Sequence, residues 1–122
     1  MIEQIKDLPK NMVGFRSSGE VTKDDFDIVK TEVEKLVDRT GKLNYLLFLD
    51  NTPADFTAGA WLQDALLGIK NLLDWNRAAI VSDSETVIGF TNVFSKVIPG
   101  EFRGFHKDEY QHAVDWTSEK TI

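Results

Sequence analysis

The sequence predicts an α/β domain: a mostly parallel sheet of four or five strands with four helices, opening with a β-hairpin. Two observations favour this class. Short apolar runs alternate with amphipathic stretches along the chain, and acidic residues or glycines mark the ends of those stretches. Strands that alternate with helices indicate parallel pairing through right-handed crossovers. A chain of 122 residues is long enough to bury a core, and we expect residues 1–122 to form a single domain.

The first forty residues predict a hairpin followed by a helix. Met1–Leu8 and Met12–Ser18 are expected to pair as strands, with Pro9 in the turn between them. Thr22 is a suitable helix N-cap, and the acidic residues after it favour the positive end of the helix dipole. Apolar residues then recur at helical spacing until Gly41, where we predict that the helix ends.

The remaining chain is expected to alternate strands with three more helices. The run Leu43–Leu49 has almost no polar alternation, which is typical of an internal strand covered on both faces. The later elements are a helix over Thr57–Leu73, a strand over Arg77–Val81, a helix with Val87, Phe90, Phe94 and Val97 on one stripe, a strand over Glu101–Phe105 and a helix over Lys107–Thr117.

Composition excludes several classes of function. The net charge of −6 disfavours binding to nucleic acid or to anionic membranes through bulk charge. The chain has no cysteine, which excludes disulfides, thiol catalysis and cysteine-ligated metals. We expect no signal peptide and no membrane-spanning segment, because charges interrupt the first ten residues and no apolar stretch is long enough. The predicted compartment is the cytoplasm, with a peripheral position on the inner face of the membrane as the alternative.

Three stretches carry a resemblance to a known family. They are the strand-to-helix joint Leu47–Leu62, the strand Arg77–Asp83 and the tail Phe105–Trp116. These stretches resemble the SpoIIAA-like family of the STAS superfamily, and in particular its small bacterial STAS/SEC14-like proteins. The resemblance implies one SpoIIAA-like domain over nearly the whole chain, with helices that swing against the sheet. It also implies either a phosphorylation switch, as in regulatory members, or the binding of a lipid-like ligand.

The resemblance places a regulatory joint at the end of the strand Leu43–Leu49. Its expected residues are Asp50, Phe56, Thr57, Ala58 and Gly59. Alignment with the Asp-Ser-Ser-Gly motif of regulatory members puts Ala58, which has no hydroxyl, at the phosphorylated serine. Thr57 matches the preceding serine; a helix N-cap is the favoured role for it and a phosphoacceptor is the alternative. The joint therefore fits a hinge for a hydrophobic helix better than a phosphorylation switch.

The acidic residues and histidines do not predict catalysis. Asp50, Asp55 and Asp83 are expected near the carboxyl ends of two neighbouring strands, where turn formation and capping are favoured over Mg²⁺ binding. His106 and His112 are six positions apart and do not share a helical face, so surface and packing roles are favoured. We expect no catalytic residue, no metal, no cofactor and no enzymatic activity.

Two of the expected helices, over Thr57–Leu73 and around Phe90, carry more apolar surface than a narrow core stripe needs. The favoured explanation is that they cover the sheet and each other; the alternative is that part of this surface contacts a ligand, a membrane or a partner. The residues predicted for ligand or membrane contact are Trp61, Leu62, Leu66, Phe90, Phe94 and Val97.

The sequence therefore predicts a non-enzymatic binding domain for a small apolar or lipid-like ligand, a membrane surface, or both. The alternative is a STAS-type regulatory module that binds a protein partner without the usual phosphoserine. Self-association into a homodimer is a third hypothesis, and we expect no nucleic-acid partner.

Overall fold

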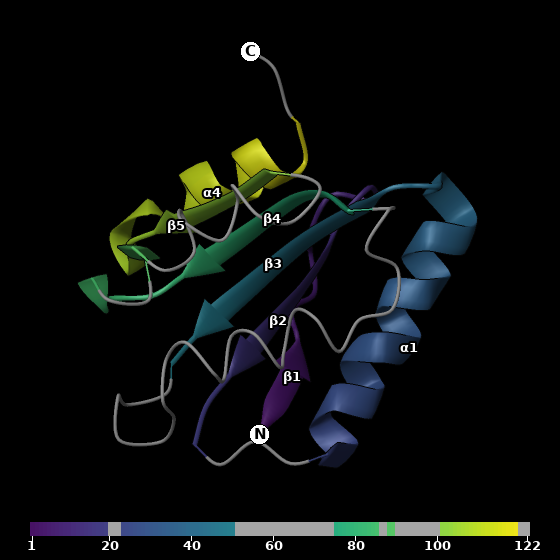
Figure 1. The fold of residues 1–122 in the computed structure, drawn as a ribbon, viewed down its shortest axis with the longest axis horizontal. Coiled ribbons are helices and arrows are strands. Elements are labelled where there is room, and N and C mark those ends of the chain that lie inside the picture. The colour runs from purple at the N-terminus through teal and green to yellow at the C-terminus, as the bar shows by residue number, and fades with distance from the viewer. Residues whose placement is uncertain (20–22, 51–74, 86–87, 90–100, 120–122) are drawn as a thin grey trace.

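A computed structural model describes residues 1–19, 23–50, 75–85, 88–89 and 101–119 (Figure 1). The elements in chain order are β1 (Ile2–Gln4), β2 (Val13–Ser17), α1 (Lys23–Thr40), β3 (Leu43–Leu49), β4 (Trp75–Val81), β5 (Glu101–Phe105), the 3₁₀ helix η3 (Lys107–Glu109) and α4 (Tyr110–Thr117).

The described strands form one five-stranded sheet in the order β1-β2-β3-β4-β5. β1 and β2 pair antiparallel, whereas β2 to β5 are parallel to one another. This arrangement confirms the predicted α/β class and the opening hairpin. Because β2 to β5 run in the same direction, their carboxyl ends meet at one edge of the sheet (Figure 1).

α1 and α4 cover opposite faces of the sheet. Successive side chains of a strand point to opposite faces, and β3 divides its residues accordingly. Tyr45 and Leu47 belong to the core under α1, whereas Leu46 belongs to the core under α4. All three side chains are buried, so β3 is the internal strand that its apolar run predicts.

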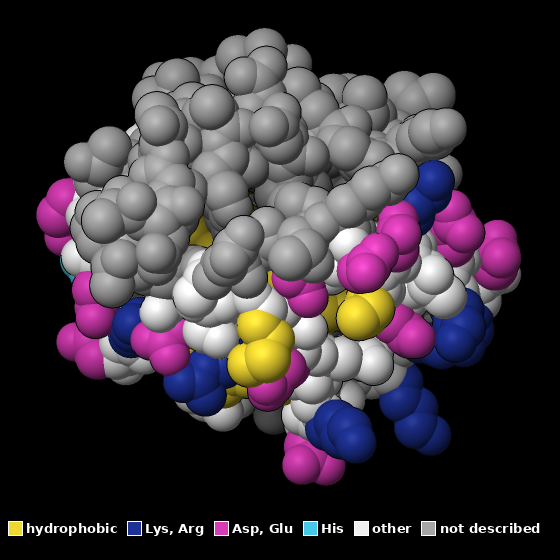
Figure 2. Space-filling view, turned by 90° about the horizontal axis from the view of Figure 1, so that it is seen from below, with side chains coloured by type: hydrophobic (Ala, Val, Ile, Leu, Met, Phe, Trp, Pro, Cys, Tyr) yellow, Lys and Arg dark blue, Asp and Glu magenta, His cyan; other side chains and the backbone are white. Residues whose placement is uncertain are grey.

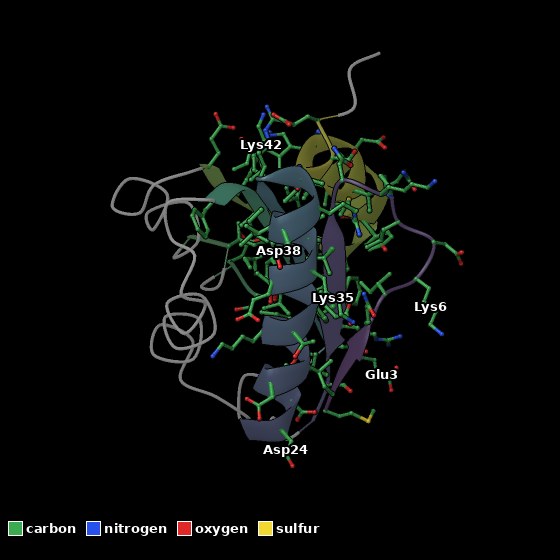
Figure 3. All side chains as sticks on the ribbon, turned by 90° about the vertical axis from the view of Figure 1, so that its right-hand side faces the viewer. Glu3, Lys6, Asp24, Lys35, Asp38 and Lys42 are labelled. Carbon is green, nitrogen blue, oxygen red and sulfur yellow. The ribbon has the colours of Figure 1, made fainter. Side chains whose placement is uncertain are left out.

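α1 follows the amphipathic pattern of its sequence. Its inner face buries Val29, Val33 and Leu36 against the sheet. Its outer face carries charged residues that include Asp24, Lys35 and Asp38 (Figure 3). The helix ends where predicted: Gly41 adopts a φ of +77°, and its backbone N–H donates to the Val37 carbonyl at 2.7 Å. A glycine tolerates this left-handed conformation at low cost.

Some boundaries differ from the predictions. β1 is shorter than Met1–Leu8, because the chain turns at Asp7, which has a φ of +64°. β4 begins at Trp75 rather than Arg77, because an irregular register between Leu43 and Asn44 lets Trp75 pair with Leu43. The last predicted helix is divided into η3 and α4.

The described part of the chain contains two α-helices, α1 and α4, of the four that were predicted. The predicted helix Thr57–Leu73 lies outside the described residues. So does the helix around Phe90, apart from positions 85 and 88–89, which are helical.

The close approach of Gly104 to Ile88 gives a test of the packing at β5. A Cβ atom on residue 104 would lie 2.8 Å from the Ile88 Cα, which is too close for an ordinary contact. We expect Gly104→Ala to lower the free energy of unfolding by about 1–3 kcal/mol, because overpacking displaces backbone. Urea denaturation followed by tryptophan fluorescence measures this change.

Gly89→Ala is the matched control, because no heavy atom lies within 4 Å of the Cβ that it adds. This control should unfold at the same urea concentration as the wild type or at a slightly higher one. Equal stability of the Gly104→Ala and Gly89→Ala variants would contradict the packing described here.

Candidate functional site

Four charged side chains meet at the carboxyl edge of the sheet. Arg16 comes from β2, Asp50 follows β3, Asp83 follows β4, and Lys107 begins η3 after β5. We call these four residues the carboxyl-edge cluster. Loops at the carboxyl ends of parallel strands are where α/β domains commonly bind ligands, so the cluster is a candidate binding site.

Asp50 is the centre of the carboxyl-edge cluster. The Arg16 Nη2 donates to Asp50 Oδ2 at 2.5 Å, and the Lys107 Nζ donates to Asp50 Oδ1 at 2.8 Å. The backbone N–H of Asp50 also donates to the Ser17 carbonyl at 2.7 Å. Hydrogen bonds between ionised groups are stronger than neutral ones. Asp50 therefore ties the end of β3 to β2 on one side and to η3 on the other.

These contacts hold Asp50 in its ionised form. The hydrogen bonds from Arg16 and then from Lys107 lower the pKa of the Asp50 carboxyl from 3.8 to about 2. The same hydrogen bond raises the pKa of Arg16. A carboxylate with so low a pKa is a weak base near neutral pH, so Asp50 is poorly suited to general base catalysis.

Lys107 also connects Asp50 with Asp83. Its Nζ lies 2.8 Å from Asp50 Oδ1 and 3.9 Å from Asp83 Oδ2, and its backbone N–H donates to Asp83 Oδ1 at 3.4 Å. The two aspartates therefore come together at the sheet edge as the sequence predicts, but they share an ammonium group. In the described ranges no group of three or more acidic or histidine residues could hold a metal ion.

A small hollow adjoins the carboxyl-edge cluster on the α4 face of the sheet. It has a volume of about 260 Å³ and is lined by Ile5, Arg16, Phe48 and Tyr110. We call it the Phe48 hollow. The Phe48 ring is half-buried, and the Tyr110 ring meets it edge-on with the centroids 5.7 Å apart. Burial raises the pKa of the Tyr110 phenol, which therefore stays protonated.

The two cations of the cluster border the same ring. The Arg16 Cζ lies 5.7 Å from the Phe48 ring centroid and the Lys107 Nζ lies 5.6 Å from it, both within cation–π range. The site thus combines an apolar surface with positive charge. Figure 2 shows that acidic and basic side chains are interspersed over the described part of the face seen from below, with small hydrophobic patches between them.

The hollow lies beside α4, because α4 packs against β3 and β4. The surface over β2 on this face is bordered instead by Ile5, which follows β1. Ile5 and Tyr110 thus form two walls around Phe48, and Arg16 forms the charged side.

The histidines take the surface and packing roles that the sequence favours. The His106 Nε2 lies 3.1 Å from a carboxylate oxygen of the exposed Glu85. The His112 ring packs edge-on against Phe105, with centroids 5.3 Å apart.

Only part of the predicted site lies in the described residues. Of the regulatory joint, Asp50 is described, whereas Phe56, Thr57, Ala58 and Gly59 lie outside the described ranges. The predicted contact residues Trp61, Leu62, Leu66, Phe90, Phe94 and Val97 also lie outside them, as does Asp55. Their roles stay predictions.

Sequence reasoning missed four residues of the site: Arg16, Phe48, Lys107 and Tyr110. For Phe48 a signal was available, because residues 46 and 48 of β3 point to the same face. Arg16 and Lys107 gave no local signal, because their contacts with Asp50 span 34 and 57 positions of the sequence.

The fold and the site define a small mixed-sheet α/β domain with a charged carboxyl edge beside an apolar hollow. The SpoIIAA-like family model matches residues 12–118, and the chain belongs to this family. A search of curated proteins gave no match.

A solved structure agrees with this assignment. It is the crystal structure of an uncharacterized protein of the DUF3478 family with a SpoIIAA-like fold, from Shewanella loihica PV-4. The two chains are 25% identical with a TM-score of 0.63, and the match covers 96% of this chain and 90% of the other.

The Asp50 contacts predict a pH dependence of stability. The folded-state pKa of about 2 lies below the ordinary value of 3.8, so the contribution of Asp50 is nearly complete above about pH 5 and is lost as the pH falls through 2. We expect Asp50→Asn to be less stable than the wild type at pH 6, with the difference shrinking between pH 4 and pH 2. Urea denaturation at several pH values measures it.

Asp83→Asn is the control, because Asp83 is mainly exposed and its nearest ammonium contact is 3.9 Å. It should change stability less than Asp50→Asn at every pH. A stability difference for Asp50→Asn that stays constant from pH 6 to pH 2 would contradict the role assigned to its charge.

Proposed function

We propose that this chain is a non-enzymatic binding domain for a small apolar or lipid-like ligand. The observation that supports the proposal is the Phe48 hollow, in which a half-buried aromatic ring lies open between Ile5 and Tyr110. Concave sites lined by apolar side chains with a few polar groups are typical of ligand binding.

The size of the hollow limits what it can hold. Its 260 Å³ lies just below the range of about 300–1,000 Å³ that is usual for drug-sized ligands. One short chain or one ring fits this space better than a whole phospholipid. Apolar burial supplies about 25 cal/mol per Å² before the entropic costs of binding, so we expect weak binding of a small ligand to the hollow alone.

Further apolar contact is proposed for the predicted helices that follow β3 and β4. Trp61, Leu62, Leu66, Phe90, Phe94 and Val97 are the proposed contact residues there for a ligand or for a membrane surface. In the described residues no helix is long and apolar enough to cross a membrane. The proposed membrane contact uses amphipathic helices lying at the interface, and sedimentation with phosphatidylcholine vesicles tests it.

A neutral fluorescent probe, N-phenyl-1-naphthylamine, tests the hollow directly. We expect the full chain to bind it with increased fluorescence, and Phe48→Ala to reduce its affinity several-fold because the apolar floor is lost. Ile5, which follows β1, lines the same hollow, so Ile5→Ala should also reduce probe affinity. This second variant provides the test if Phe48→Ala does not fold.

Ile28→Ala is the matched control, because Ile28 is an exposed apolar residue on α1, 47% accessible. It should leave probe binding unchanged. Absence of binding by the wild type, or equal binding by Ile5→Ala and the wild type, would contradict a ligand site in the hollow.

The second candidate is a regulatory module that binds a protein partner through the joint after β3. Membership of the SpoIIAA-like family favours it, as does the anchoring of Asp50, the first residue of the joint, by Arg16 and Lys107. Because Asp50 is held in place, a modification later in the joint would change the conformation of the joint itself and so the surface that binds a partner.

Mass spectrometry of the protein isolated from its own cells tests this candidate. A phosphate on Thr57, together with a purified partner whose binding is lost in Thr57→Ala, would support a phosphorylation-dependent module. Unmodified Thr57 and unchanged partner binding by Thr57→Ala would contradict the switch.

A further inference from the structure

The apolar surface of Phe48 lies beside two cations that already share one carboxylate. Arg16 and Lys107 lie within 6 Å of the Phe48 ring centroid, and each donates a hydrogen bond to Asp50. The three charges sum to one excess positive charge next to the hollow, in a chain whose net charge is −6. Two exposed carboxylates outside the lining of the hollow offset this charge: Asp83, whose Oδ2 lies 3.9 Å from the Lys107 Nζ, and Glu3, which pairs with Arg16 across β1 and β2 and whose charge also raises the pKa of Arg16.

Both cations have hydrogen-bonding capacity beyond Asp50. A guanidinium carries five N–H donors and an ammonium carries three, whereas the contacts with Asp50 use one nitrogen of each residue. The Arg16 side chain is 56% exposed and lines the hollow itself. A second anion can therefore approach Arg16 from the hollow while the apolar part of the same ligand lies on Phe48.

We propose that the Phe48 hollow binds an anionic amphiphile, a carboxylate on a short aliphatic or aromatic body, whose anion pairs with Arg16 and Lys107 in competition with Asp50. This inference rests on the proposed function and names the class of its ligand. The apolar part packs between Ile5, Phe48 and Tyr110. The volume of 260 Å³ suits a single short chain.

Competition with Asp50 predicts the direction in which a substitution of Asp50 changes the affinity for the ligand. The carboxylate of Asp50 repels a second carboxylate and occupies donors that the ligand needs. Removing the charge of Asp50 should therefore strengthen binding of the anion, although it weakens the native contacts of the protein. A residue with a merely structural role would show the opposite effect.

Calorimetric titration with octanoate and octan-1-ol tests the inference, because the two probes share a chain and differ in charge. We expect the full chain to prefer octanoate by about tenfold, which corresponds to about 1.4 kcal/mol, close to the lower end of what a hydrogen bond to a charged group contributes. Arg16→Gln and Lys107→Gln should each lower octanoate affinity by about threefold and leave octan-1-ol affinity unchanged. Asp50→Asn should bind octanoate several-fold more tightly.

Lys35→Gln is the matched control, because Lys35 is an exposed cation on the outer face of α1 (Figure 3). It should bind both probes like the wild type. Equal affinity of octanoate and octan-1-ol, with no effect of Arg16→Gln, would overturn the inference but leave the proposed apolar function intact. Failure of both probes and of the neutral fluorescent probe would overturn the proposed function as well. Weaker octanoate binding by Asp50→Asn would overturn the competition.

Discussion

β3 lies between two parallel neighbours, and both of its faces are covered, so its alternating side chains hold the two helical layers on the sheet. Tyr45 and Leu47 pack under α1, and Leu46 packs under α4. The same alternation brings Phe48 to the α4 face, and the chain then leaves the sheet at Asp50. Both parts of the candidate site, the aromatic floor and the central carboxylate, are thus placed by one strand whose position the core determines.

The site combines charge with apolar surface. Surface ion pairs alone contribute little to stability, but here two cations converge on one carboxylate and also lie against one aromatic ring. The pairing keeps Arg16 and Lys107 beside Phe48 instead of leaving them free to extend into solvent. Asp50 thereby organises the cations and limits their availability to other anions.

Much of the fold was predictable because its signals are local. The apolar run Leu43–Leu49 and the strand Glu101–Phe105 were predicted to the residue, and Gly41 ends α1 as expected. The start of β4 was missed, because the pairing of Trp75 depends on a register irregularity in β3. The site was predicted only at Asp50, which follows β3 directly, and at Asp83, two positions after the end of β4. Lys107 joins them through a contact that only the folded sheet creates.

The long sequence separation of the Asp50 contacts also bears on the kinetics of the molecule. Its partners lie 34 and 57 positions away: the Arg16 contact requires β2 and β3 to have paired, and the Lys107 contact requires β5 to have joined the sheet as well. Contacts that form after the folding transition state affect the rate of unfolding far more than the rate of folding. We infer that the Asp50 contacts are of this late kind, so their loss should speed unfolding more than it slows folding.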